Sequence, residues 1–144
     1  MSRYFILMTA LFLSLAATSC APSRERADKK LAAACEGSIR SLYEQNDRID
    51  IRKTSFLSGK GHGDVSLRIV KLDADFARNG GIVQEKTWTC SYKEQWSLFG
   101  YMPEFYNLEK DGARYGNFDG KIVGDFADLM KINAATEKSL GGFK

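Results

Sequence analysis

Residues 85–96, EKTWTCSYKEQW, decide the fold because they predict a strand with two unlike faces. Trp88, Cys90 and Tyr92 alternate with small hydroxylated residues. Successive side chains of a strand point to opposite faces of a sheet, so the three large residues share one face. We predict a strand over residues 82–96, with Cys90 pointing into the core.

The segment LAAACEGSIRSLYEQ, residues 31–45, predicts the partner of that strand. Its apolar positions, Cys35 among them, fall three or four residues apart, which is the spacing of one stripe on a helix. We expect a helix from about residue 28 to residue 45 with Cys35 facing the core. A helix laid across the apolar face of a sheet would bring Cys35 and Cys90 into one layer.

The remaining strands are predicted from alternation and turn residues. They are residues 49–57, 64–72, 105–109 and 113–118. Asp111 and Gly112 stand between the last two, and Asp-Gly between alternating runs is a strong hairpin signal.

A second helix is predicted near the C-terminus, in GDFADLMKINAATEKSLGG. Asp125 can cap its first turn and Gly141 can end it. The order of elements predicts an α+β fold in which an N-terminal helix packs on a four- to five-stranded antiparallel sheet, with a C-terminal helix.

The first twenty residues have the pattern of an export signal. Arg3 precedes an uncharged run over residues 4–19 that ends in small residues. As a helix this run would span roughly 24 Å, less than the ~30 Å hydrocarbon core of a bilayer. We therefore expect cleavage and not a permanent membrane helix.

Ala17, Thr18, Ser19 and Cys20 resemble the lipobox of bacterial lipoprotein precursors, although Leu is commoner than Ala at the first position. The resemblance implies cleavage before Cys20, a diacylglycerol on its sulfur and acylation of the new amino group, with palmitate as one such chain. Ala21 follows the lipobox cysteine in place of Asp, and in this it resembles lipoproteins that are sent to an outer membrane. Ordinary signal peptidase cleavage is the alternative.

This interpretation divides the chain into three parts. Residues 1–19 are the expected signal peptide, residues 20–30 a lipid-anchored tether, and residues 31–144 a single α+β domain. The expected location is the cell envelope, with the domain held at the outer membrane and facing the periplasm.

Acylation of Cys20 would leave Cys35 and Cys90 as the remaining cysteines of the chain. An even pair in an exported domain indicates one disulfide, and closing a loop of this length is worth about 4 kcal/mol in the chain-entropy model. Two separate buried thiols are the alternative. Two cysteines and the single His62 are too few ligands for a closed zinc site, so we expect no metal or cofactor.

The charge pattern argues against a nucleic-acid partner. The formal net charge of the 144 residues is +3, and basic and acidic residues are interspersed without blocks of like charge. The expected partners are the membrane, through the anchor, and an envelope protein, peptide or glycan.

No motif assigns a catalytic residue. SGKGHGD, residues 58–64, lacks the phosphate-binding pattern and predicts a hairpin turn. LDADFARNGG, residues 72–81, lacks the glycine and glutamate of a calcium loop. Scattered carboxylates such as Glu104 and Asp119 could form a hydrolytic pair only if the fold brought two of them together.

An aromatic band over residues 92–118 is the most suggestive region. In a domain this small some of these rings should be exposed, and exposed aromatic residues with nearby cations suit a binding surface. The predicted binding face consists of Trp96, Tyr101, Phe105, Tyr106, Arg114 and Tyr115. Core on one side and edge protection on the other is the alternative for the same residues.

These observations favour a lipoprotein that acts as a binding or interaction module without catalysis. One alternative is an inhibitor or immunity-type lipoprotein, which would present a protruding loop to an envelope-attacking enzyme. The other is a small carboxylate-based hydrolase.

Overall fold

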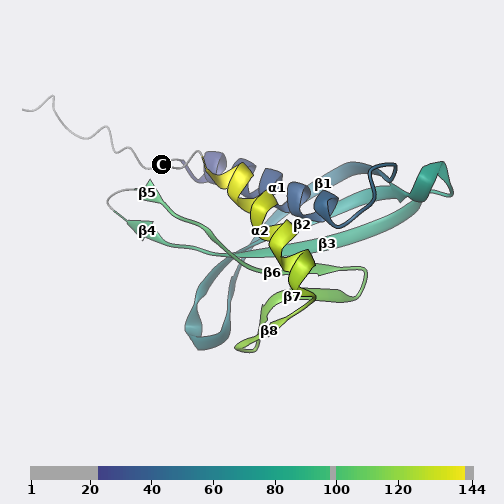
Figure 1. Ribbon diagram of the computed structural model, residues 1–144. Helices are drawn as coiled ribbons and strands as arrows, with labels where there is room; N and C mark the ends of the chain where they lie inside the picture. Colours follow the sequence, from purple (N-terminus) through teal and green to yellow (C-terminus); the bar gives the residue numbers. More distant parts are fainter. Residues whose placement is uncertain (1–22, 98–99, 142–144) are drawn as a thin grey trace, which may run out of the picture.

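The domain is built on an antiparallel sheet of six strands, with one helix lying on the sheet and a second beside it (Figure 1). The computed structural model describes residues 23–97 and 100–141. Its elements are α1 (Arg24–Ser41), β1 (Arg48–Lys60), η1 (His62–Asp64), β2 (Ser66–Ala77), η2 (Arg78–Gly80), β3 (Gln84–Lys93), β4 (Trp96–Ser97), β5 (Gly100–Tyr101), β6 (Glu104–Lys110), β7 (Ala113–Phe118), β8 (Lys121–Val123) and α2 (Phe126–Leu140). The predicted α+β class is confirmed.

The sheet has more strands than the four or five predicted. Its order is β1-β2-β3-β6-β7-β8, and β4 and β5 pair separately as a two-stranded hairpin. The predicted strand over residues 82–96 is shorter, because the chain leaves the sheet after Lys93. The N–H of Met102 then donates to the carbonyl of Gln95 at 2.9 Å, which closes the β4–β5 hairpin.

Helix α1 begins earlier than predicted. The Ser23 side chain accepts from the N–H of Arg26 and caps the helix. Ala27 is already buried. Residues 24–30, expected as tether, are therefore helical; the signal peptide and Cys20 lie outside the described residues.

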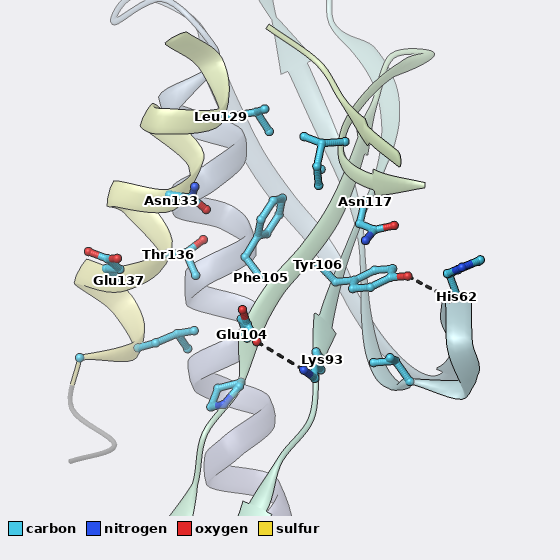
Figure 2. Close-up of a pocket in the computed structure, with 16 residues that line it drawn as sticks. His62, Lys93, Glu104, Phe105, Tyr106, Asn117, Leu129, Asn133, Thr136 and Glu137 are labelled. Atoms are coloured by element: carbon cyan, nitrogen blue, oxygen red, sulfur yellow. Dashed lines mark hydrogen bonds and ion pairs between the residues drawn. The ribbon is translucent and has the colours of Figure 1, made fainter. Parts of the chain in front are cut away.

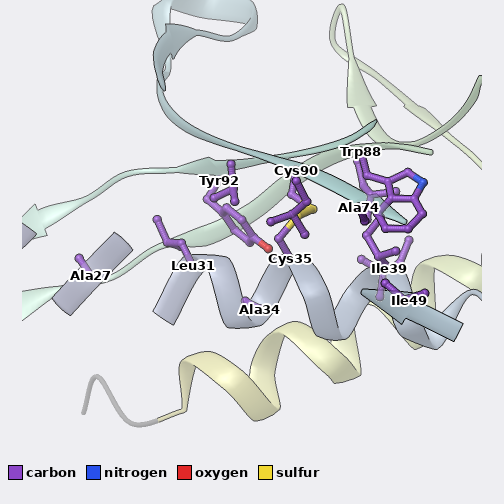
Figure 3. Close-up of a cluster of buried hydrophobic side chains, with 14 of the residues drawn as sticks. Ala27, Leu31, Ala34, Cys35, Ile39, Ile49, Ala74, Trp88, Cys90 and Tyr92 are labelled. Carbon is purple, nitrogen blue, oxygen red and sulfur yellow. A yellow bond between two sulfur atoms is a disulfide. The ribbon is translucent and has the colours of Figure 1, made fainter. Parts of the chain in front are cut away.

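The core lies between α1 and the inner face of the sheet (Figure 3). The helix contributes Leu31, Cys35 and Ile39, and the facing strand β3 contributes the three large residues singled out in the sequence, all fully buried. Cys35 and Cys90 form the predicted disulfide, with Cα atoms 5.7 Å apart. The bond fixes the middle of α1 to the centre of the sheet.

Helix α2 packs mainly against α1 and touches the sheet at β7. Its predicted cap is confirmed, because the Asp125 carboxylate accepts from the N–H groups of Ala127 and Asp128. Where the helices meet, the hydroxyls of Ser38 and Thr136 lie 3.0 Å apart and are buried. Neither helix of the described part of the chain is long and apolar enough to cross a membrane.

The β6–β7 turn is clamped to the chain just after α1. The Tyr43 hydroxyl donates to the Asp111 carboxylate, Lys86 Nζ lies 3.1 Å from that carboxylate, and Lys110 Nζ lies 3.8 Å from the Tyr43 ring centroid. Burial opposes ionisation of Asp111. The Tyr43 hydrogen bond and the Lys86 charge nevertheless hold its pKa below the usual value.

We expect Asp111→Asn to lower the free energy of unfolding by about 1 kcal/mol at neutral pH, because a charged hydrogen-bond acceptor is lost. A lowered pKa in the folded state stabilises above the unfolded pKa of about 3.9 and loses that effect as pH falls through the folded value. The difference between wild type and variant should therefore shrink below about pH 4. Urea unfolding over a pH series measures it.

Asp119→Asn is the matched control for this experiment. Asp119 is exposed, sits in the β7–β8 turn and has a φ of 53°, close to the 51° of Asp111. If both variants lose the same stability with the same pH dependence, turn conformation and not the Tyr43 clamp is responsible.

Candidate functional site

A groove of about 1160 Å³ opens between α2 and the end of the sheet where β6 and β7 separate (Figure 2). Helix α2 forms one wall, β6 and β7 with Ile122 of β8 form the other, and the β1–β2 connection closes one side. The lining residues are His62, Val65, Lys93, Pro103, Glu104, Phe105, Tyr106, Gly116, Asn117, Ile122, Leu129, Asn133, Thr136, Glu137, Leu140 and Gly141.

A β-bulge in β6 shapes the floor of this groove. Ser91 of β3 pairs with Asn107, but the next residue of β3 pairs with Phe105, so Tyr106 has no opposite residue. A bulge re-aims side chains, and here it separates two neighbouring aromatic residues. Figure 2 shows Phe105 on the α2 side of β6 and Tyr106 on the side of His62.

Strands β6 and β7 diverge immediately beyond the bulge in β6. Asn107 is the last residue of β6 on this side that pairs with β7, opposite Gly116. The Asn107 amide then donates to the carbonyl of Asn117 at 2.9 Å, so a side chain replaces the backbone pairing. The open fork of β6 and β7 therefore lets α2 face a hollow and not a closed sheet.

Gly116 permits the close approach of the two strands at the fork. Its φ is +98°, and a Cβ built there would lie 2.5 Å from the carbonyl oxygen of Tyr106. An L-residue would meet both an unfavourable backbone conformation and the backbone of the neighbouring strand.

The tip of the β1–β2 hairpin bends back to the groove. The N–H of His62 donates to the Tyr106 hydroxyl at 2.9 Å, and a Cβ on Gly120 would lie 3.1 Å from the His62 ring. The predicted turn over residues 58–64 is shorter in the structure, because residues 58–60 still pair with β2 and only residues 61–65 connect the two strands. The tip of the hairpin is tied to the β6 wall. LFGYMPE, residues 98–104, is the other loop that could protrude in an inhibitor, and its residues 98 and 99 lie outside the described part of the chain.

The charged residues of the groove are of both signs. Lys93 Nζ lies 3.8 Å from a carboxylate oxygen of Glu104, and Glu137 stands on the α2 wall. Both glutamates are exposed, whereas the general acid of a glycosidase is shielded from water. Among residues 23–97 and 100–141 no group of three histidine, cysteine or acidic residues could hold a metal ion.

The structure divides the predicted binding face among three places. Phe105 and Tyr106 line the groove. Trp96 and Tyr101 stack in the β4–β5 hairpin, with ring centroids 4.4 Å apart, and Tyr101 is fully buried.

The last two residues of the predicted binding face lie on opposite sides of β7. Tyr115 pairs across from Leu108 and packs against the core, and burial raises its pKa. Its neighbour Arg114 points away from the helices, pairs with Glu109 and lies over the Phe118 ring at 3.9 Å. The alternative of core on one side and edge on the other thus describes Tyr115 and Arg114 well.

The contribution of α2 and β8 to the groove was not predicted from the sequence. Leu129, Asn133 and Ile122 line it. Next to them, Phe126 and Met130 are 75% and 55% exposed. The available signal was the apolar stripe over the first two turns of the second helix, which is typical of a helix that covers the edge or end of a sheet.

No protein-family model, curated protein or solved structure shows a significant match to this chain. The groove is therefore interpreted from its own residues.

Proposed function

We propose that the chain is a bacterial cell-envelope lipoprotein, anchored through Cys20, whose domain binds a segment of a partner protein in the groove beside α2 and does not catalyse a reaction. The signal and lipobox pattern support the anchor. The disulfide between Cys35 and Cys90 supports an oxidising compartment such as the periplasm. A location at the outer membrane rests on Ala21.

One observation carries the binding role: an exposed apolar rim borders a groove of mixed polarity. Ile122, Phe126 and Met130 are each more than half exposed, and Phe105 and Leu129 line the hollow beside them. Contiguous exposed apolar surface with a polar surround is typical of protein interfaces, in which Phe, Met and Ile side chains meet apolar groups of a partner.

We expect a photo-crosslinking residue at Ile122 to form a specific adduct in intact cells, and Asn133→Arg to reduce that adduct at least about tenfold, as loss of a well-packed contact does. Asn133 is exposed on α2 and lines the groove. The longer, charged arginine side chain would therefore occupy the hollow and leave the packing of the core unchanged. Immunoblotting and mass spectrometry of the adduct provide the measurement.

Ala134→Arg is the matched control, because Ala134 is also exposed on the same helix but is not among the residues that line the groove. A crosslinker at Ile82, which is 87% exposed beside the β2–β3 turn, tests for unspecific capture. If both arginine variants leave the adduct unchanged, or Ile82 captures the same protein, the groove is not the binding site. If the adduct contains a glycan and no protein, the groove binds a carbohydrate and the proposal of a protein partner is wrong.

A further inference from the structure

The β4–β5 hairpin is fixed to the beginning of α1. Arg24, the first residue of the helix, forms an ion pair with Glu94 just before the hairpin. Its guanidinium also lies over the Trp96 ring, 5.0 Å from the centroid. The Tyr101 hydroxyl donates to Glu94 at 2.8 Å and completes the attachment. Figure 1 shows β4 and β5 at the same end of the molecule as the start of α1.

This end carries exposed apolar surface that the core does not need. Trp96 is 45% exposed and Met102 is 51% exposed. Tryptophan is enriched where one side of a ring meets lipid and the other meets water. The first turns of α1 add Arg24, Arg26, Lys29 and Lys30 against only Glu25 and Asp28, so this end has an excess of positive charge for anionic headgroups.

The position of Cys20 brings this end to a membrane. The helix cap Ser23 is the third residue after Cys20. A fully extended chain spans at most about 3.6 Å per residue, so these three steps cover roughly 11 Å at most. If Cys20 carries acyl chains in a bilayer, the start of α1 cannot leave the headgroup region by more than that distance. The hairpin attached to Arg24 must stay close by.

We infer that the β4–β5 hairpin is a second membrane contact, in which Trp96 and Met102 enter the headgroup region of a phospholipid bilayer beside acylated Cys20. This inference rests on the proposed lipoprotein function. The contact fixes the orientation of the domain, so that the groove rim at Ile122 and Phe126 faces away from the lipid. A single flexible tether would leave that orientation free.

The test uses the full acylated protein, extracted from membranes and reconstituted in vesicles of phosphatidylcholine and phosphatidylglycerol. Half of the vesicles contain lipid brominated near the headgroup end of its acyl chains, which quenches nearby indole fluorescence. Trp88, the other tryptophan, is fully buried, so it should not respond. We expect quenching in wild type and none in Trp96→Phe, whose ring can still stack on Tyr101.

The double variant Trp96→Phe/Phe126→Trp is the matched control. Position 126 is 75% exposed at the start of α2, the end of the helix that lies away from the start of α1, and its indole should not be quenched (Figure 1). Equal quenching at positions 96 and 126 would show that the domain has no fixed orientation and would overturn the inference.

Intact mass of the same preparation separates this inference from the proposed function. A mass that fits residues 20–144 with acyl chains, together with unquenched Trp96, overturns the membrane contact and leaves the anchor. A mass without acyl chains overturns both. Trp96 that resists aqueous iodide yet escapes the brominated lipid has a different occupant, and this outcome also overturns the membrane contact.

Discussion

Replacing Cys35 and Cys90 together by alanine is expected to lower the free energy of unfolding by about 4 kcal/mol. The two residues are 55 apart in the chain, and a crosslink over a loop of this length removes much of the conformational freedom of the unfolded state. Both cysteines are fully buried, so lost packing adds to the effect. Since a domain of this size has roughly 5–15 kcal/mol in total, much of its stability depends on one bond.

Urea unfolding of oxidised wild type, reduced wild type and the double variant measures this effect. The reduced protein should unfold somewhat above the midpoint of the double variant, because its buried thiols keep their packing, and reductant should leave the variant unchanged. A difference below about 1 kcal/mol between oxidised and reduced wild type would mean that the unfolded chain is already compact around these residues. In that case the bond would link α1 to β3 in the native state without adding to the free energy of unfolding.

The sequence predicted the parts of this fold that depend on neighbouring residues. Alternation around Cys90 identified the inner face of β3, and the helical stripe around Cys35 identified the inner face of α1, because both patterns follow directly from backbone geometry. The Asp125 cap and the Asp111-Gly112 turn were predicted for the same reason. The disulfide followed from these two faces and from the number of cysteines.

The groove could not be predicted in the same way, because it depends on long-range pairing. Nothing near Tyr106 in the sequence indicates that this residue bulges out of register with β3. Alternation also fails after Lys93, where the chain leaves the sheet and carries Trp96 and Tyr101 into a separate hairpin. The predicted binding face grouped aromatic residues that are close in the sequence, and the structure separates them at these two points.

The position of α2 was only partly accessible for a related reason. Phe126, Leu129 and Met130 share one apolar face of this helix, which suggests cover for an edge or end of the sheet, but such a stripe does not say which element lies against it. In the structure Phe126 and Met130 stay exposed. Ile132 is buried, Leu129 and Asn133 face the hollow, and Thr136 both contacts Ser38 of α1 and lines the hollow. The choice between another helix and the sheet is set by the width of the sheet, which a local pattern does not contain.

Gly116→Ala is expected to lower the free energy of unfolding by about 3 kcal/mol, the second-largest effect among these predictions. Left-handed backbone at a residue with a Cβ costs roughly 1–2 kcal/mol, and overlap with a neighbouring backbone adds a comparable amount. The overlap is with the carbonyl oxygen of Tyr106, which would lie 2.5 Å from the added Cβ. Because this oxygen belongs to the backbone, it cannot rotate away as a side-chain atom would.

Gly112→Ala separates the two causes. Gly112 also has a left-handed φ, +81°, but a Cβ there would have nothing within 4 Å, so its expected loss is only about 1 kcal/mol from backbone strain. Urea unfolding of both variants gives the difference directly. A larger loss for Gly116 would mean that the fork of β6 and β7 is held by close backbone packing, so that the groove exists before any partner binds. Equal losses would mean that the strands separate easily at Gly116, and the groove would then take its final shape only around a partner.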